Sequence, residues 1–178
     1  KDLCTIEFMD KIIDAGVTVF KIEGRARSAE YVKTVARCYR DAADAVLAGK
    51  YTPEYASELK ERLSTVFNRG FWDGYYQGAR LGEWSEVYGN KATKSKKYIG
   101  KVTNYFSNIG VAEILIETGS ISVGDNVIII GPSTGVVEVT VEEIRVDLKS
   151  TESAVKGEYC SIAVPEKLRR SDKLYLFQ

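Results

Sequence analysis

The stretch Val17-Thr18-Val19-Phe20-Lys21-Ile22-Glu23-Gly24-Arg25-Ala26-Arg27-Ser28 decides how the first half of the chain is interpreted. Residues 17–23 are rich in β-branched and aromatic side chains up to Gly24, a composition that predicts a strand. Side chains alternate along a strand, so Lys21 and Glu23 share one face and the opposite face is wholly apolar. A strand followed by a polar turn and a helix is typical of a β/α layer.

In β/α folds, functional sites form where the strands end. Lys21, Glu23 and Arg25 are therefore the candidate catalytic residues. Glu23 can act as a base, and Lys21 or Arg25 can bind an anionic group. A buried Lys–Glu pair that only closes the core explains the same residue types equally well, so both interpretations stay open.

Composition excludes several classes of function. The 178 residues allow one large or two small domains, and 44% of them are hydrophobic. Lys plus Arg and Asp plus Glu both number 25, so no global field attracts nucleic acid or membrane. Histidine is absent, which removes His-based triads and His metal sites. The three cysteines show no CxxC pairing, no apolar run is long enough to span a membrane, and a cytoplasmic location is expected.

Helical signals surround the first stretch. A short helix is expected before Ala15-Gly16, with Asp2 or Thr5 as its cap, and a longer one over residues 29–48 with Ser28 as its cap. Thr52-Pro53 predicts a further helix start. Residues 71–89 then mix aromatic residues with glycine, including Arg80 as a basic neighbour. This composition favours a domain interface over a surface that stacks bases or sugars.

The second half of the chain is predicted to form β-structure. After a basic linker at residues 90–97, six strands are expected with no helical pattern between them, which predicts a small closed barrel. The expected strands cover residues 98–106, 111–117, 126–130, 136–146, 159–164 and 174–177. The linker lysines Lys94, Lys96 and Lys97 are candidates for binding the phosphates of a nucleic acid. A solvated hinge is the alternative for such a run of charge.

Five motifs stand out together in the first 90 residues. They are Lys1-Asp2-Leu3-Cys4, Asp14-Ala15-Gly16-Val17, Phe20-Lys21-Ile22-Glu23-Gly24-Arg25, Ser28-Ala29-Glu30-Tyr31-Val32 and Tyr39-Arg40. This set resembles the peptidase U-32 family, whose members are often named collagenase-like proteases. The second half is similar to the C-terminal barrel of many members, and that barrel is similar to domain two of elongation factor Tu-type translation proteins.

The resemblance implies a C-terminal portion of a larger protein, with a catalytic TIM-like β/α barrel lying mainly upstream. Several members are implicated in hydroxylating transfer RNA or ribosomal RNA, and some carry an iron–sulfur cluster on four cysteines. The resemblance aligns Cys4 with the last of these ligands, while the other three are not in this chain. A cluster is thus an expectation for the full-length parent, and none is expected in this chain alone. A buried thiol at a helix start is the alternative for Cys4.

The residue types of this chain give little support to a proteolytic activity. Peptide hydrolysis needs an activated nucleophile or a metal-bound water. The chain has no histidine and no nucleophile elbow, so RNA modification is favoured for the parent and a peptidase fragment remains the alternative. The chain alone is expected to be inactive.

We therefore predict an α+β chain in three parts. Residues 1–48 are the last units of a truncated β/α barrel, residues 49–90 a helical and aromatic connector, and residues 91–178 a six-stranded β-barrel. Expected partners are the missing N-terminal catalytic part and transfer or ribosomal RNA, with a homodimer or a purely structural barrel as alternatives. A strand at residues 17–23 would lack its neighbours, so it should pair with another chain or rearrange locally.

Overall fold

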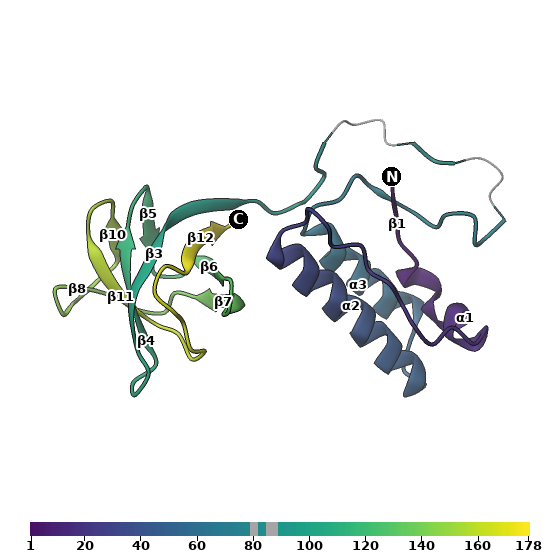
Figure 1. Cartoon of the computed structure of the whole chain (residues 1–178), viewed down its shortest axis with the longest axis horizontal. Coiled ribbons are helices and arrows are strands. Elements are labelled where there is room, and N and C mark those ends of the chain that lie inside the picture. The colour runs from purple at the N-terminus through teal and green to yellow at the C-terminus, as the bar shows by residue number, and fades with distance from the viewer. Residues whose placement is uncertain (79–81, 85–88) are drawn as a thin grey trace. The chain divides into compact units, whose positions relative to one another are not determined.

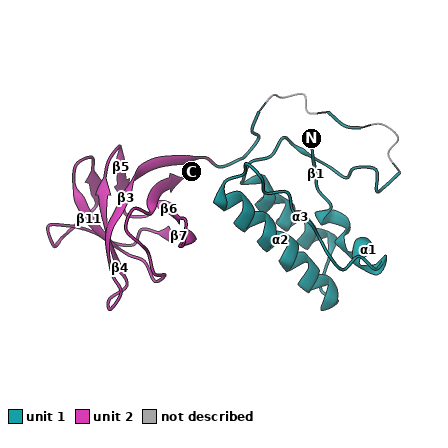
Figure 2. Ribbon diagram, in the orientation of Figure 1, with its two compact units in different colours: residues 1–94 teal, residues 95–178 magenta. Residues whose placement is uncertain are grey.

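A computed structural model of the protein describes residues 1–78, 82–84 and 89–178. These residues form two compact units, Lys1–Lys94 (unit 1) and Ser95–Gln178 (unit 2), which Figure 2 colours separately. Unit 1 is mainly helical, and unit 2 consists of antiparallel strands (Figure 1). The mixture of helices in the first half and antiparallel β-structure in the second half is thereby confirmed. No helix of the described residues is long and apolar enough to cross a membrane.

The core of unit 1 lies between two long helices and a short helical segment. Helices α2 (Ala29–Leu47) and α3 (Pro53–Ser64) pack together, while η1 (Ile6–Phe8) contacts α3 and α1 (Met9–Asp14) contacts α2. Apolar side chains from all four segments are buried in one cluster. Burial of these apolar faces stabilises helices that would be marginal alone.

The start of α3 follows from local sequence. The Thr52 hydroxyl accepts the N–H of Tyr55 at 3.2 Å, and Pro53 occupies the first helical position, where no backbone N–H is needed. Helix α2 also starts where expected, but the Ser28 side chain makes no capping hydrogen bond. Side-chain capping is therefore confirmed at α3 and wrong at α2.

The first residues of the chain are held by a short parallel pair. Strand β1 (Asp2–Leu3) pairs with β2 (Phe71–Trp72), and the N–H of Cys4 donates to the carbonyl of Trp72 at 2.9 Å. This pair joins the start of the chain to the segment after α3. Thr5 is thereby placed beside α2.

The predicted strand at residues 17–23 is wrong. The segment has no regular secondary structure and pairs with no strand of the described chain, and Val19 is 81% exposed. A β-prone sequence becomes a strand only when a neighbour supplies hydrogen bonds and a packing surface. Without such a neighbour the described residues of unit 1 form no β/α layer, so the tail of a TIM-like barrel is not seen.

Unit 2 contains more strands than expected. Their bounds are β3 (Lys96–Phe106), β4 (Val111–Ile116), β5 (Ser120–Ser122), β6 (Asn126–Gly131), β7 (Gly135–Thr140), β8 (Ile144–Val146), β9 (Lys149–Thr151), β10 (Ser153–Val155), β11 (Tyr159–Ala163) and β12 (Lys173–Phe177). The single strand expected over residues 136–146 is divided into β7 and β8. Strands β5, β9 and β10 were not predicted, because a segment of three residues is too short to show the alternation of apolar and polar side chains that marks a strand.

Eight of these strands form one antiparallel sheet in the order β7-β6-β12-β3-β4-β11-β8-β9, and β5 pairs separately with β10. The order of this sheet runs from β7 to β9, and unit 2 has ten strands where six were expected. Buried side chains from both sheets nevertheless make a single core. The alternating burial along β4 and β12 shows which side chains face that core.

One glycine permits the close approach of two central strands. A Cβ atom placed at Gly100 in β3 would lie 2.0 Å from the carbonyl oxygen of Leu115 in β4. No side chain fits at that distance, so glycine is required at this point of the β3–β4 pair. The register of their pairing also shifts between Val102 and Asn104, which bends β3.

Candidate functional site

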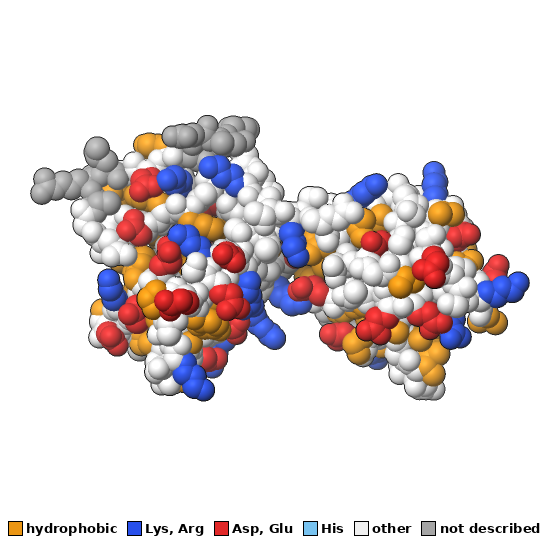
Figure 3. All heavy atoms as spheres, turned by 180° about the vertical axis from the view of Figure 1, so that it is seen from behind, with side chains coloured by type: hydrophobic (Ala, Val, Ile, Leu, Met, Phe, Trp, Pro, Cys, Tyr) orange, Lys and Arg blue, Asp and Glu red, His pale blue; other side chains and the backbone are white. Residues whose placement is uncertain are grey.

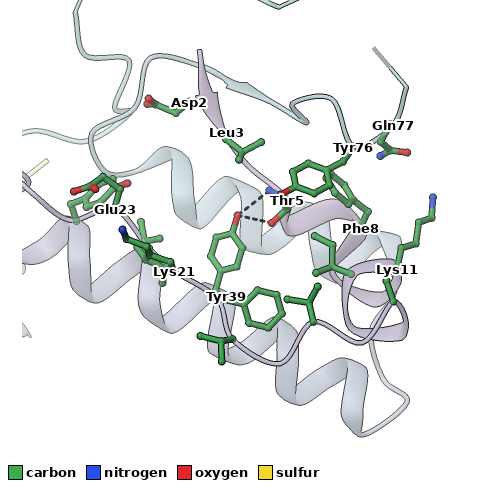
Figure 4. A pocket seen from close by; sticks show the side chains of 18 of the residues that line it. Asp2, Leu3, Thr5, Phe8, Lys11, Lys21, Glu23, Tyr39, Tyr76 and Gln77 are labelled. Carbon is green, nitrogen blue, oxygen red and sulfur yellow. Dashed lines mark hydrogen bonds between the residues drawn. The ribbon is translucent and has the colours of Figure 1, made fainter. Parts of the chain in front are cut away.

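Unit 1 contains a cavity of about 780 Å³ (Figure 4). Its wall is built by the start of the chain, α1, the unpaired residues 17–23, one side of α2, and the residues Tyr76 and Gln77. A volume of this size is usual for small-molecule and cofactor sites. Two of the three predicted catalytic residues, Lys21 and Glu23, line this cavity, which makes it the candidate site of unit 1.

Lys21 and Glu23 lie at the same end of this cavity (Figure 4). They lie there together even though residues 17–23 belong to no sheet. The backbone N–H of Arg25 donates to Glu23 Oε1 at 2.6 Å, so this carboxylate also holds the turn that follows. The structure thus brings Lys21 and Glu23 together as expected from their spacing.

Arg25 is not among the residues that line the cavity, whereas Arg27 is. The Arg27 guanidinium carbon lies 4.1 Å from the ring centroid of Phe67 and 5.5 Å from that of Tyr31. Cation–π contacts of this kind orient a guanidinium without neutralising it. Arg27 was not predicted as a site residue. Its spacing of two residues from Arg25 was the pattern that could have indicated it.

Tyr39 of α2 supplies a hydroxyl group in the middle of the cavity (Figure 4). This hydroxyl accepts the Thr5 N–H at 2.9 Å, and the Thr5 hydroxyl lies 3.3 Å from it. Burial, followed by the neighbouring Cys4, raises the pKa of Tyr39 to about 12, so the phenol keeps its proton at neutral pH. Nothing in the sequence distinguishes Tyr39 from a packing tyrosine, because its role depends on β1.

The charged groups of the cavity differ in their pairing. Asp2 is engaged by Arg69, whose backbone N–H and Nε both lie 2.9 Å from its carboxylate oxygens. Within the described residues, neither Lys21 nor Arg27 has an ion-pair partner. Lys11 also lines the cavity, so three lining cations have no ion-pair partner among the described residues, while Glu23 adds a carboxylate beside Lys21.

Cys4 is a buried thiol, 6% exposed, and the Tyr39 hydroxyl donates to its sulfur at 3.9 Å. Burial raises the pKa of Cys4 and also that of Cys38, which favours the neutral thiols. No group of three or more potential metal ligands exists among the residues the structure describes. Because a cluster needs four ligands, the residues present do not make an iron–sulfur site by themselves.

Unit 2 carries a second candidate site on the outer side of its sheet. We call the outward side chains of Lys96, Tyr98, Lys101, Tyr159, Lys173 and Tyr175 the tyrosine–lysine face. Register places Tyr175 opposite Tyr98 and Lys173 opposite Lys101, and the neighbours Leu174 and Leu176 point into the core. The rings of Tyr98 and Tyr175 are 5.5 Å apart, and Lys96 Nζ lies 5.1 Å from the Tyr175 centroid. Residues from β3, β11 and β12 thus meet on one surface.

Of the three lysines predicted to bind nucleic acid, Lys96 and Lys97 lie on opposite sides of β3, and the binding role of all three stays a prediction. Lys94 is the last residue of unit 1, and Lys96 joins the tyrosine–lysine face. Lys97 points to the other side of β3, near Gly119, because side chains alternate along a strand. The residues of β12 that accompany Lys96 on this face were not predicted. The alternation of Lys173, Tyr175 and Phe177 along the sequence was the pattern that could have indicated them.

Glu117 links two members of this face. Lys101 Nζ lies 2.7 Å from its carboxylate, and the hydroxyl of Tyr98 donates to the same group. The Lys101 ammonium, followed by the Tyr98 hydroxyl, lowers the pKa of Glu117. Partial burial, followed by this carboxylate, raises the pKa of Tyr98 to about 12. The phenol of Tyr98 is therefore neutral at all ordinary pH values.

The aromatic, glycine-rich stretch at residues 71–89 is only partly described. Residues 79–81 and 85–88, which include Arg80, lie outside the described residues. Trp72 and Tyr75 pack edge to face with centroids 5.3 Å apart, and Trp84 is 87% exposed. The choice between an interface and a stacking surface stays a prediction.

Comparison with known proteins places the chain in a family. Residues 1–86 match the sequence model of "Peptidase family U32". "Collagenase" of Porphyromonas gingivalis is 57% identical over 177 residues, which cover 99% of this chain and 43% of that protein. "Uncharacterized protease MJ0090" of Methanocaldococcus jannaschii is 35% identical over 181 residues, which cover 100% of this chain and 44% of that protein.

A third relative carries a different name. "tRNA hydroxylation protein P" of Haemophilus influenzae is 27% identical over 171 residues, which cover 94% of this chain and 36% of that protein. The chain belongs to peptidase family U32, as its five motifs indicated, and it spans less than half the length of these relatives. Their alignments continue beyond residue 86 and therefore include unit 2.

Proposed function

We propose that this chain is the RNA-positioning part of an RNA hydroxylation enzyme. Unit 2 contacts the RNA through the tyrosine–lysine face, and unit 1 contributes Lys21 and Glu23 to a catalytic site completed by the rest of the protein. The observation that carries the proposal is the Tyr98–Tyr175 ring pair flanked by Lys96. Proteins that bind single-stranded nucleic acid combine aromatic platforms for the bases with cations for the phosphates.

Two further observations support this proposal. Relatives named for tRNA hydroxylation align with both units of this chain. Acidic and basic side chains are interspersed on the face seen in Figure 3, in keeping with a net formal charge of zero. General electrostatic attraction is therefore weak, and RNA affinity must come from a local surface.

The decisive experiment measures binding of total transfer RNA to the full chain by fluorescence anisotropy over a range of salt concentrations. We expect micromolar binding that weakens as salt rises, because lysines displace counterions from the phosphates. Lys96→Gln should reduce the slope of log affinity against log salt by about 1. Lys156→Gln, at an exposed turn, is the matched control. Absence of binding at low salt contradicts the proposal.

A tyrosine variant separates stacking from charge. Tyr175→Leu keeps an apolar side chain over the sheet but removes the ring, and we expect a roughly 5- to 150-fold loss of affinity, since stacking on a base contributes about 1–3 kcal/mol. The salt slope should stay unchanged. Equal affinity of this variant and the natural chain contradicts a stacking role.

The same proposal includes the fold of the whole protein. Residues 17–23 then form a strand of a β/α barrel whose other strands lie elsewhere in the longer protein, and Cys4 joins three cysteines from there on an iron–sulfur cluster. Iron and sulfide analysis of the longer protein and of its Cys4→Ser variant tests the second statement. Equal iron content in the two contradicts it.

A peptidase is the second candidate, favoured by the 57% identity with a protein named collagenase. This chain supplies three thiols, which are all buried and whose pKa values burial raises, so they are poor nucleophiles at neutral pH. Gelatin hydrolysis by the longer protein, lost on Glu23→Gln, would favour the peptidase. We expect no hydrolysis by this chain.

A further inference from the structure

The loop between β11 and β12 carries two exposed arginines between two buried anchors. Leu168 belongs to the core of unit 2. The buried carboxylate of Asp172 accepts from the Arg169 N–H at 2.8 Å and from the Thr134 hydroxyl at 2.6 Å. Arg169 and Arg170 lie between these anchors, and both are exposed. The loop therefore fixes the backbone of both arginines while their side chains face solvent.

The backbone of this loop is strained next to the arginines. Ser171 has a φ of 71°, a left-handed conformation that serine rarely adopts. The Ser171 N–H donates to the Val102 carbonyl at 2.9 Å, and the Val102 N–H donates to the Asp172 carbonyl at 2.8 Å. Strained backbone that surrounding hydrogen bonds hold in place is typical of binding sites.

Both arginines are oriented by neutral oxygen atoms. Arg169 Nη1 donates to the Thr134 hydroxyl at 3.3 Å. Arg170 Nε donates to the Thr103 carbonyl at 2.6 Å, at the point where the register of β3 with β4 shifts. A bulge leaves its extra residue outside the ladder, and Arg170 satisfies the carbonyl that is released there. Each contact orients a guanidinium group and leaves its other N–H groups for a ligand.

The acidic groups near this loop do not neutralise the arginines. Glu113, beside the bulge in β4, accepts from the Thr103 hydroxyl at 2.6 Å, and Asp172 is already engaged. Glu166 is exposed at the start of the loop. Neither arginine has an ion-pair partner among the described residues. An anion can therefore bind here without breaking an internal pair, and the planar fork of a guanidinium suits a phosphate.

The arginine loop continues the tyrosine–lysine face along β3 and β12, which lie side by side (Figure 1). Along β3 the ring of Tyr98 comes first, Lys101 second and Thr103 third. Because Arg170 donates to Thr103, aromatic rings and cations follow one another in a line. Thr103 lies roughly 16 Å beyond Tyr98, at about 3.3 Å per residue of strand. A stacked nucleic acid strand advances about 3.4 Å per nucleotide, so about five steps cover this distance.

We propose that Arg169 and Arg170 form a phosphate-binding site that extends the tyrosine–lysine face, so that unit 2 binds a single-stranded RNA segment of about six nucleotides. Bases at one end of the segment stack on Tyr98 and Tyr175, and phosphates at the other end bind the arginines. RNA is taken as the ligand on the basis of the proposed function, on which this inference rests. An acidic peptide would match the arginines but would leave the rings without a base to stack on.

Anisotropy of labelled diuridylate and hexauridylate with the full chain, over a range of salt concentrations, tests this site. A dinucleotide is too short to reach from the rings to the arginines. Arg170→Gln should therefore weaken binding of hexauridylate about fivefold and leave that of diuridylate unchanged, and the salt slope for hexauridylate should fall by about 0.7. Arg37→Gln, at an exposed position of α2, is the matched control. Equal effects of Arg170→Gln and Arg37→Gln on hexauridylate overturn the proposal.

A second variant separates charge from a structural role at the bulge. Arg170→Gln keeps a side-chain N–H for the Thr103 carbonyl, so the thermal unfolding midpoint should stay unchanged. Arg170→Lys keeps the charge but loses the planar fork, so it should retain the salt slope and have an intermediate affinity. A lower midpoint of Arg170→Gln with unchanged affinity for hexauridylate would make the arginine purely structural and overturn the proposal.

The remaining outcomes distinguish the arginine site from the proposed function. If Tyr175→Leu weakens binding of hexauridylate and Arg170→Gln does not, the rings position RNA and the arginine site alone is overturned. If Arg170→Gln weakens binding and Tyr175→Leu does not, the arginine site stands and the ring platform of the proposed function is overturned. Equal affinity for hexaglutamate and hexauridylate would make an acidic peptide the ligand and overturn RNA at this site.

Discussion

Residues 17–23 in unit 1 and β6 in unit 2 are chemically similar but structurally different. Both are rich in β-branched side chains, yet β6 pairs with β12 on one side and β7 on the other, while residues 17–23 pair with nothing described. Val127 and Ile129 of β6 are buried in the core, whereas Val19 is exposed to solvent. The difference teaches that a neighbouring strand, more than composition, makes an extended segment a strand. It also leaves the side chains of residues 17–23 free to line a cavity.

The largest expected effect is in amide hydrogen exchange. The N–H groups of β6 lie in a ladder between two strands, whereas those of residues 18–23 donate no hydrogen bond within the described structure. We expect exchange in the centre of β6 to be slower by a factor of about 1,000 or more, since it requires opening of the sheet. Mass spectrometry of exchanged peptides measures the ratio. Equal protection would show that residues 17–23 find a partner in solution.

Truncation of matched side chains gives the next largest difference. Ile129→Ala should lower the free energy of unfolding of unit 2 by about 2–5 kcal/mol, because it leaves a cavity in a fully buried position. Val19→Ala should change stability by about 0.5 kcal/mol or less, since the side chain is solvated. Urea denaturation measures both. A large effect of Val19→Ala would mean that this segment is packed against another copy of the chain.

Replacing a carboxylate should also affect stability differently in the two units, as Asp172 of unit 2 and Glu23 of unit 1 illustrate. Asp172 of unit 2 is buried, and it accepts from the Thr134 hydroxyl at 2.6 Å and from the Arg169 N–H at 2.8 Å. Asp172→Asn replaces one acceptor by a donor and should cost about 1–3 kcal/mol. Glu23→Gln changes an exposed group and should have little effect on stability.

Urea denaturation of both variants tests this pair of expectations. Equal effects would contradict the view that Asp172 fixes a loop while Glu23 serves a ligand. Gly131→Ala is a further check, because a Cβ there would lie 1.7 Å from Asp172 Oδ1. It should destabilise unit 2 through the same contact.

The extent to which sequence predicted this structure follows from the range of the interactions involved. The start of α3 was predictable because Thr52 and Pro53 act within one turn of helix. Strands β3, β4 and β11 were predictable because their sequences extend over five residues or more, and β6 was predictable from its continuous run of β-branched residues. Residues 17–23 were predicted wrongly, because strand formation depends on a neighbour that local sequence does not report.

The candidate sites show the same limit. Lys21 and Glu23 were found from their spacing, which any extended backbone preserves. Arg27 and Tyr39 were missed because their places in the cavity depend on the packing of Phe67 and on the β1–β2 pair. On the tyrosine–lysine face, Lys96 was found as part of a basic run, but its contact with Tyr175 requires the pairing of β3 with β12, which are far apart in the sequence.

The smallest expected effect is a pH dependence of stability that arises at the tyrosine–lysine face. Hydrogen bonds from Lys101 and Tyr98 hold the pKa of Glu117 below its ordinary value, so the folded state binds this proton less readily than the unfolded chain does. The resulting stabilisation is present above the unfolded pKa of about 4.3 and is lost as pH falls through the lowered, folded pKa. The thermal midpoint should therefore fall slightly more between pH 5 and pH 3 in the natural chain than in Glu117→Gln. The difference should shrink in 1 M salt, because both partners are solvent-exposed and screened. Identical pH profiles of the two proteins would show that the pair on this face contributes nothing to the stability of the sheet.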